Sequence, residues 1–233
     1  EEFIMKRRKV AKLMAVVALV GAVGVGGSLA LLTATTGPVT NTFTAGKNLT
    51  PTDLKLDEYQ LSDDNRTANK ELDRVNNLQF KNLMQRDEMD KDPTVQIKGT
   101  AAQCYMFVKV TGLQELKNKG ITVDWNNVWV KADGNDSSAD GYYYYSGNRG
   151  AVPGRQNVID PSLLTYDTIT PEDGYFELES LFTKVTVEDT ATIYGANNNI
   201  GSIKAWACAV QAQNVDSWED AYTALPDNFK NAQ

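Results

Sequence analysis

The chain contains no histidine among its 233 residues, and this absence limits the chemistry that its side chains can perform. Neither a Ser-His-Asp triad nor a Cys-His pair can form, and the His-Glu-x-x-His motif of zinc proteases is missing. A zinc site would need carboxylates and the two cysteines, an uncommon ligand set. Catalysis by carboxylates alone, as in glycosidases, remains formally open. We therefore expect no enzymatic activity, no bound metal and no cofactor.

One short segment carries oxygen ligands at a spacing that can hold calcium. These residues are Asp133, Asn135, Ser137 and Asp140. The EF-hand pattern, however, needs glycine at its sixth position and glutamate at its twelfth, where this chain has Ser138 and Tyr144. A plain hairpin loop is therefore the favoured interpretation, and calcium binding by residues 133–141 is the alternative.

Four consecutive tyrosines, Tyr142 to Tyr145, follow this segment and suggest an aromatic platform for sugars. In a strand, alternate side chains point to opposite faces, so at most two of the tyrosines share a surface. Half-buried tyrosines that pack on a sandwich are the commoner arrangement.

The two cysteines, Cys104 and Cys208, lie in the two most strongly strand-forming segments. In an exported protein a disulfide is permissible, and one that closes so long a loop would add on the order of 3–5 kcal/mol. The alternative is two buried free thiols that act as small hydrophobic groups. The pattern leaves these two alternatives even, because a bridge needs close and correctly aimed Cα atoms.

Many short strands with few helices must position these residues. Strands are expected around Leu54 and Leu56, after Pro93, and in residues 103–112, 121–134, 141–147, 179–189 and 202–213. The segment 103–112 is apolar on both faces, which predicts a central strand. Short helices are expected in 113–120 and from Asp216-Ser217 to Pro226, and 62–77 is expected to be a surface loop. The pattern predicts an all-β sandwich with short peripheral helices.

The first 30 residues have the three parts of a secretory signal peptide, and we expect a signal helix there. Basic residues follow Met5, and an apolar, glycine-containing run extends from Leu13 to Leu32. Ser28 and Ala30 are the small residues that a signal peptidase requires, so cleavage is expected between Ala30 and Leu31. We expect residues 1–4 to precede the natural start at Met5. The alternative is a retained membrane anchor, because the run is near the length that spans a bilayer.

Without residues 1–30, the chain keeps 18 basic and 28 acidic residues, a net charge of −10. Such a surface disfavours nucleic acid, whose phosphates need a basic surface. Residues 47–233 are long enough to form one all-β domain with a sizeable core. Residues 31–46 form an arm before this domain. In it Val39, Asn41, Phe43 and Ala45 alternate with threonines, which is a strand pattern with a threonine-rich face.

Several stretches taken together resemble the TasA/camelysin group of exported bacterial proteins. They are the basic, glycine-rich leader followed by VTNTFTAGK, then NLMQRDEMDKDPTV, CYMFVKVTG, DGYYYYSG, SLFTKVTV and IKAWACAVQAQNVDSWEDAY. Their order and spacing, rather than any single piece, carry the resemblance, which covers nearly the whole chain. One departure is Gln85-Arg86, where the family commonly has Pro-Gly, and it weakens the turn expected there.

The resemblance implies a jelly-roll-like β-sandwich, a leader removed by a SipW-type signal peptidase, and assembly into extracellular fibres of a biofilm matrix. In TasA-like fibres the N-terminal strand of one subunit is added to the sheet of the next. The resemblance thus assigns residues 31–46 as a donor strand, with Phe43 as its anchor and Val39 beside it. It implies that the partner is the chain itself, with other matrix proteins or exopolysaccharide as further partners.

Two other functions compete with a secreted matrix subunit. One is a cell-surface glycan-binding module that uses the tyrosine cluster, and the other is a secreted protease, because camelysin carries a peptidase label. The missing histidines argue against the protease. Fold alone does not choose among the three, since sandwiches host all of them.

Overall fold

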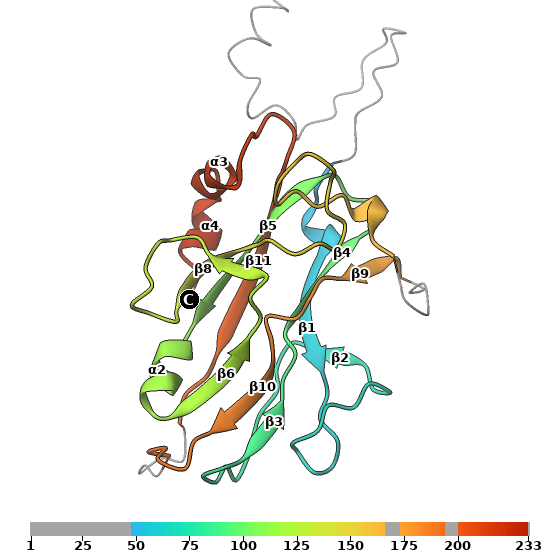
Figure 1. The fold of residues 1–233 in the computed structure, drawn as a ribbon. Coiled ribbons are helices and arrows are strands. Elements are labelled where there is room, and N and C mark those ends of the chain that lie inside the picture. Colours follow the sequence, from blue (N-terminus) through green and yellow to red (C-terminus); the bar gives the residue numbers. More distant parts are fainter. Residues whose placement is uncertain (1–47, 166–172, 194–199, 233) are drawn as a thin grey trace, which may run out of the picture. The chain divides into compact units, whose positions relative to one another are not determined.

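The computed structural model describes residues 48–165, 173–193 and 200–232. They belong to one compact unit, Ala45–Gln233. Within the described residues this unit consists mostly of three antiparallel sheets with a few short helices (Figure 1). This architecture agrees with the predicted all-β sandwich with short peripheral helices. No helix among the described residues is long and apolar enough to cross a membrane. The predicted signal helix lies outside the described residues.

The three sheets draw their strands from distant parts of the sequence. The first sheet has the order β2-β1-β4-β9, with β2 at Arg74–Val75, β1 at Leu54–Tyr59, β4 at Thr94–Lys98 and β9 at Tyr175–Glu177. The second has the order β3-β10-β6, with β3 at Glu88–Asp90, β10 at Phe182–Val187 and β6 at Ile121–Trp125. The third has the order β11-β5-β8-β7, with β11 at Lys204–Gln211, β5 at Cys104–Thr111, β8 at Gly141–Tyr145 and β7 at Trp129–Lys131.

The helices are short and lie between strands or after the last one. They are α2 at Leu113–Asn118, α3 at Trp218–Thr223 and α4 at Asp227–Lys230, with 3-10 turns η2 at Pro51–Asp53 and η3 at Pro161–Leu163. The Ser217 hydroxyl accepts a hydrogen bond from the Asp220 N–H and so caps α3, as the sequence predicted. The sequence did not predict α4, which begins directly after Pro226.

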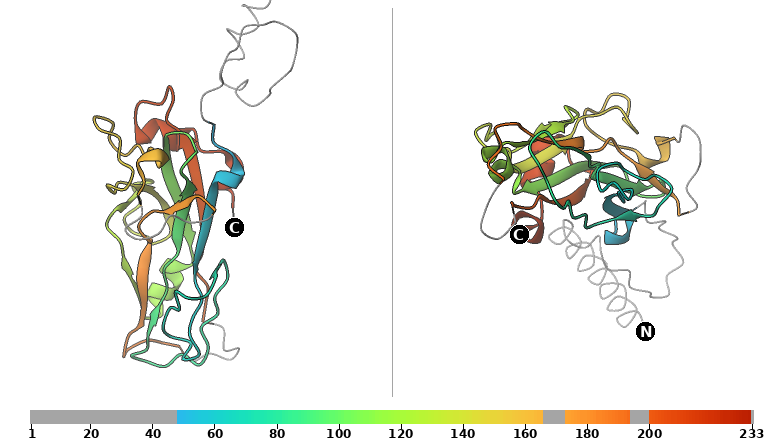
Figure 2. Two further views of the ribbon diagram at one scale, coloured as in Figure 1. Left: turned by 90° about the vertical axis from the view of Figure 1, so that its right-hand side faces the viewer. Right: turned by 90° about the horizontal axis from the view of Figure 1, so that it is seen from below.

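The sheets pack as layers around one large apolar core. Seen edge-on in the left view of Figure 2, β10 lies in a layer apart from that of β1, β5 and β11. Buried residues of all three sheets meet in this core, among them Ile97 of β4, Val108 of β5 and Val185 of β10. A second, smaller cluster forms where α3 and α4 cover the opposite face of β5, around Phe107 and Phe229. β5 therefore has apolar neighbours on both faces and a paired strand on both edges, as predicted for a central strand.

Two local predictions need correction. Residues 121–134 and 141–147 were expected to form two strands around a polar loop, but 121–134 divides between β6 and β7, which lie in different sheets. The polar segment 62–77, expected to be a surface loop, also contributes the short strand β2.

Arg74 holds β2 in place. Its guanidinium lies 2.5 Å from Asp57 and 3.3 Å from both Asp92 and Glu177, and only 11% of the side chain is exposed. It also stacks over the Tyr59 ring. The four partners come from outside β2, so one side chain fastens the long polar loop to the first sheet.

Candidate functional site: the open edge of β11

The residues that the sequence assigns to export and assembly lie outside the described residues. They are the cleavage positions Ser28, Ala30 and Leu31 and the arm positions Val39, Asn41, Phe43 and Ala45. The structure does describe the three sheets and their outermost strands.

One edge of β11 is open in the part of the chain that the structure describes. β11 pairs with β5 over all eight of its residues in one unbroken register, from Lys204 opposite Thr111 to Gln211 opposite Cys104. It is the outermost strand of its sheet, and no described strand pairs with its other edge. β1 lies beside β11, with Cα atoms within 8 Å, yet no ladder joins the two.

The hydrogen bonds around Cys104 show which backbone groups point to that edge. The Cys104 N–H donates to the Ile159 carbonyl and its carbonyl accepts from the Ile159 N–H, so both groups point away from β11. In an antiparallel ladder this direction alternates along each strand, so Met106, Val108 and Val110 also point their backbone groups away from β11. The β11 residues opposite these three do not bond to β5 and direct their own N–H and C=O groups to the outer edge. These residues are Ala209, Ala207 and Ala205.

The two faces of β11 differ in character. Ala205, Ala207 and Ala209 pack against the large core, which also includes the partly buried Leu54 and Leu56 of β1. Trp206, Cys208 and Val210 pack against the smaller cluster beneath α3 and α4. Every residue from Ala205 to Gln211 is partly exposed, whereas most of β5 is buried. A strand added at this edge would therefore find small side chains on one face and large ones on the other.

The two cysteines do not form a disulfide. Cys208 lies opposite Phe107, so it shares the face of the smaller cluster, whereas Cys104 points into the large core. The two strands are neighbours, but the two side chains leave opposite faces of the sheet. Both thiols are free. This result corrects the disulfide alternative, because the twofold alternation of a strand prevents these sulfur atoms from meeting.

The tyrosines divide between the two faces of β8, as their alternation predicted. Tyr143 and Tyr145 are buried in the large core. Tyr144 stacks on Trp218 of α3, with ring centroids 4.1 Å apart and planes 11° apart. Tyr142 packs edge-on against Tyr222, also on α3. The two outward tyrosines thus anchor α3 on the sheet, and the Tyr144 ring already has a stacking partner.

The segment 133–141 is a hairpin loop whose oxygen atoms already have partners. The Asp133 carboxylate accepts from the Asn135 and Tyr142 N–H groups, and the Asp140 carboxylate accepts from those of Gly112 and Gln114 at the start of α2. The Lys131 ammonium donates to the carbonyls of Ser138 and Asp140 and lies 3.9 Å from the Asp133 carboxylate.

A lysine ammonium therefore supplies the positive charge that a calcium ion would bring to this loop. Gly141 permits the close packing: its φ is +141°, and a Cβ there would lie 2.1 Å from the Asp133 Oδ2 atom. The arrangement favours the plain hairpin interpretation over calcium binding. Among the described residues, no group of three or more carboxylate or cysteine side chains is placed to hold a metal ion.

Sequence reasoning did not single out Ala205, Ala207 and Ala209. The available signal was the segment 204–211 itself, in which small and large uncharged residues alternate without a charged residue after Lys204. The pattern predicts a strand, but nothing in a single sequence indicates which strand of a sheet lies at its edge. Comparison with known proteins gives no further assignment, because no family model, curated protein or solved structure matches this chain.

Proposed function

We propose that the chain is a secreted structural subunit that assembles head to tail, by donor-strand exchange, into extracellular fibres of a biofilm matrix. In this proposal residues 1–30 are a signal helix that a signal peptidase removes, and the three sheets belong to a jelly-roll-like sandwich. The subunit works as a polymer at the cell surface or in the matrix, beside other matrix proteins or exopolysaccharide. It is neither an enzyme nor a nucleic-acid-binding protein. The observation that carries the proposal is the open edge of β11.

Edge strands normally carry features that prevent pairing with other chains, such as charges, prolines, bulges or short length. β11 has none of these between Ala205 and Gln211: the segment is uncharged, contains no proline and runs in unbroken register with β5. At eight residues it exceeds the usual strand length of about five or six. Such an edge can pair with a further strand, and in a fibre subunit this pairing would join one subunit to the next.

The arm of a second copy has the alternation that this edge requires. Val39, Asn41, Phe43 and Ala45 would share one face of the added strand. On the alanine side of β11 the side chains are small, and a ring such as that of Phe43 would pack over them beside the large core. The contact joins two different surfaces of the subunit, so it propagates instead of closing into a dimer.

Insertion between β1 and β11 requires these strands to separate. Two strands that flank a third lie about 9–10 Å apart, whereas β1 and β11 now approach within 8 Å. No described ladder joins β1 to β11, so their separation breaks no backbone pair between them. Because β1 is paired with β2 and β4, polymerisation would displace these strands together with β1.

The decisive variant is Ala207→Pro. Proline removes one N–H group, and at Ala207 this group points to the open edge and not to β5. The variant should therefore stay folded but fail to accept a strand. Electron microscopy and sedimentation of the mature chain should show fibres for the wild type and for the control Ala207→Ser, and monomers for Ala207→Pro. Normal fibres from a folded Ala207→Pro variant would refute the assignment of this edge.

The donor side is tested separately. Deletion of residues 31–46 should leave a folded domain that does not polymerise, and Phe43→Asp should come close to this result. Truncation of a buried anchor costs on the order of 2–4 kcal/mol of binding free energy. If the deleted form builds normal fibres, the arm is not the joint.

A further inference from the structure

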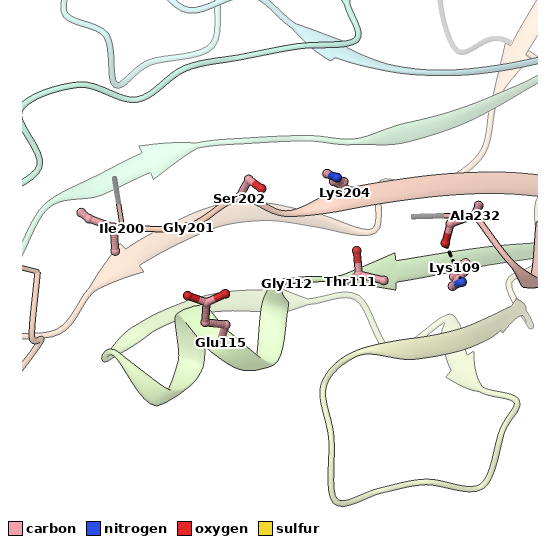
Figure 3. A pocket seen from close by; sticks show the side chains of 9 residues that line it. All are labelled: Lys109, Thr111, Gly112, Glu115, Ile200, Gly201, Ser202, Lys204 and Ala232. Atoms are coloured by element: carbon pink, nitrogen blue, oxygen red, sulfur yellow. Dashed lines mark hydrogen bonds between the residues drawn. The ribbon is translucent and has the colours of Figure 1, made fainter. Parts of the chain in front are cut away.

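A surface cavity of about 540 Å³ lies where β5 ends, α2 begins and β11 starts. Its volume falls within the range of about 300–1,000 Å³ that is usual for small-molecule sites. Figure 3 shows its polar side chains: Lys109 and Thr111 come from β5, Glu115 from α2, Ser202 from the segment before β11, and Lys204 from the first position of β11.

The register of the sheet brings these groups together. Lys204 lies opposite Thr111 and Trp206 opposite Lys109, so all four side chains leave the same face of the sheet. The end of β5 lies close against the segment that leads into β11. At Gly112, whose φ is +81°, a Cβ atom would lie only 2.0 Å from the Ser202 carbonyl oxygen. A glycine is therefore needed at 112 to keep this part of the cavity in shape.

The cavity presents positive charge in an acidic protein. The Lys109 ammonium donates to the carbonyls of Lys230 and Ala232, at 2.7 and 2.8 Å, and lies above the rings of Tyr142 and Trp206. An ammonium group has three N–H donors, so one remains for a ligand. Lys204 is exposed, and its ammonium makes no ion pair or hydrogen bond with any described residue.

Hydroxyl groups and one carboxylate complete the lining. The hydroxyls of Thr111 and Ser202 make no hydrogen bond within the described part of the chain, so both can serve a ligand. Glu115 is held by Lys119 at 2.6 Å and keeps free acceptor positions. This carboxylate would repel a compact dianion such as phosphate but would accept a hydrogen bond from a hydroxyl group. The lining thus fits a ligand with a single negative charge and several hydroxyls.

We propose that this cavity binds an acidic sugar, a hexuronate unit of a polysaccharide. Its carboxylate pairs with Lys204 and with the remaining N–H of Lys109, while its ring hydroxyls bond to Thr111, Ser202 and Glu115. The inference goes beyond the assembly role and does not depend on it, because all the groups that it uses belong to one chain. Failure to bind the sugar would leave the fibre proposal intact, and failure to form fibres would leave this inference intact.

The test measures binding of trigalacturonate to the purified chain by calorimetry, with amide chemical shifts of residues 109–115 and 200–204 to locate the site. Maltotriose serves as the neutral sugar and inorganic phosphate as the simple anion. Lys204→Gln should weaken trigalacturonate binding by about threefold to tenfold, the size of one partly exposed charge contact. The control Lys81→Gln makes the same charge change on an exposed lysine that is not part of the cavity and should leave binding unchanged.

Four results would overturn the inference. They are no binding of trigalacturonate at about 10 mM, equal binding of maltotriose, equal binding of phosphate in the cavity, and equal losses for Lys204→Gln and Lys81→Gln. Changes in amide chemical shift that are confined to residues outside the cavity would also show that the sugar binds elsewhere. Binding of trigalacturonate alone, weakened by Lys204→Gln only and mapped to these residues, would support it.

Discussion

Cys104 and Cys208 lie on paired strands, yet their side chains leave opposite faces of the sheet. Both thiols should therefore be found free, and both should react slowly in the folded chain because burial raises their pKa. At pH 8 a thiol reagent should modify the partly exposed Cys208 before the buried Cys104, and denaturant should expose two thiols per chain. Detection of no thiol in denaturant would show that a bridge exists.

Alkaline pH should destabilise the fold. Burial raises the pKa of Cys104 and Tyr143 to about 12 and that of Cys208 to about 11, so the folded chain holds these protons more tightly than the unfolded chain. The resulting stability is complete below the ordinary thiol pKa of 9.0 and is lost as the pH rises towards 12. The urea midpoint should fall across this range, and less steeply for Cys104→Ala. A midpoint constant to pH 12 would contradict the assignment.

Arg74→Met should strongly destabilise the first sheet. The change leaves Asp57, Asp92 and Glu177 close together without their shared cation, and we expect a loss of about 2–4 kcal/mol in the free energy of unfolding. Arg86→Met is the matched control, because 81% of that side chain is exposed and its only described ion pair is with Asp189 at 3.5 Å. It should cost less than about 0.5 kcal/mol. Urea unfolding of both variants tests the contrast, and equal losses would refute it.

The stability of the 133–141 loop should not depend on calcium, because the Lys131 ammonium already supplies positive charge there. Calcium at about 5 mM, enough to fill weak extracellular sites, should leave the melting temperature unchanged. Lys131→Met removes the donor to the carbonyls of Ser138 and Asp140 and should cost about 1–3 kcal/mol. Lys117→Met, on the exposed side of α2, is the control and should have little effect. A calcium-dependent rise in the melting temperature of the wild type would contradict this role.

The leader should be cleaved after Ala30 when the chain is exported. Mass spectrometry of the secreted protein should find Leu31 as the first residue, because Ser28 and Ala30 satisfy the small-residue requirement of the peptidase. Ala30→Leu should retain the leader, whereas Ala34→Leu, which lies beyond the cleavage site, should not. A chain that begins at Met5 in the membrane fraction would support a retained anchor.

Periodicity was sufficient to predict the longer strands but not the short strands β2, β3 and β9, nor the partner of any strand. The apolar runs of β5, β10 and β11 and the capping serine of α3 are local signals, and the structure confirms these elements. The distribution of β6 and β7 between two sheets depends on contacts distant in the sequence, which no local pattern records. The opposite directions of the two cysteine side chains follow from strand alternation and from the register between β5 and β11. That register is set by tertiary packing, so the sequence alone does not predict it.

The candidate site was predictable only in part. The arm and its alternation are visible in the sequence, whereas the alanines of β11 look like ordinary strand residues. The same limit applies to Lys131: the sequence shows the oxygen atoms of its loop but not the ammonium that lies among them. Arg74 likewise looks like part of a polar loop, because its three carboxylate partners come from three separate segments.

The pairing of β11 with β5 also bears on when association can begin. Gln211 pairs with Cys104, roughly a hundred positions earlier, so this ladder closes one of the longest loops in the fold. Contacts of such sequence separation form slowly, and during synthesis they must wait for the last strand to leave the ribosome. The unpaired edge of β11 is therefore absent from the nascent polypeptide, so the association that we propose at this edge would begin only after β11 has joined β5.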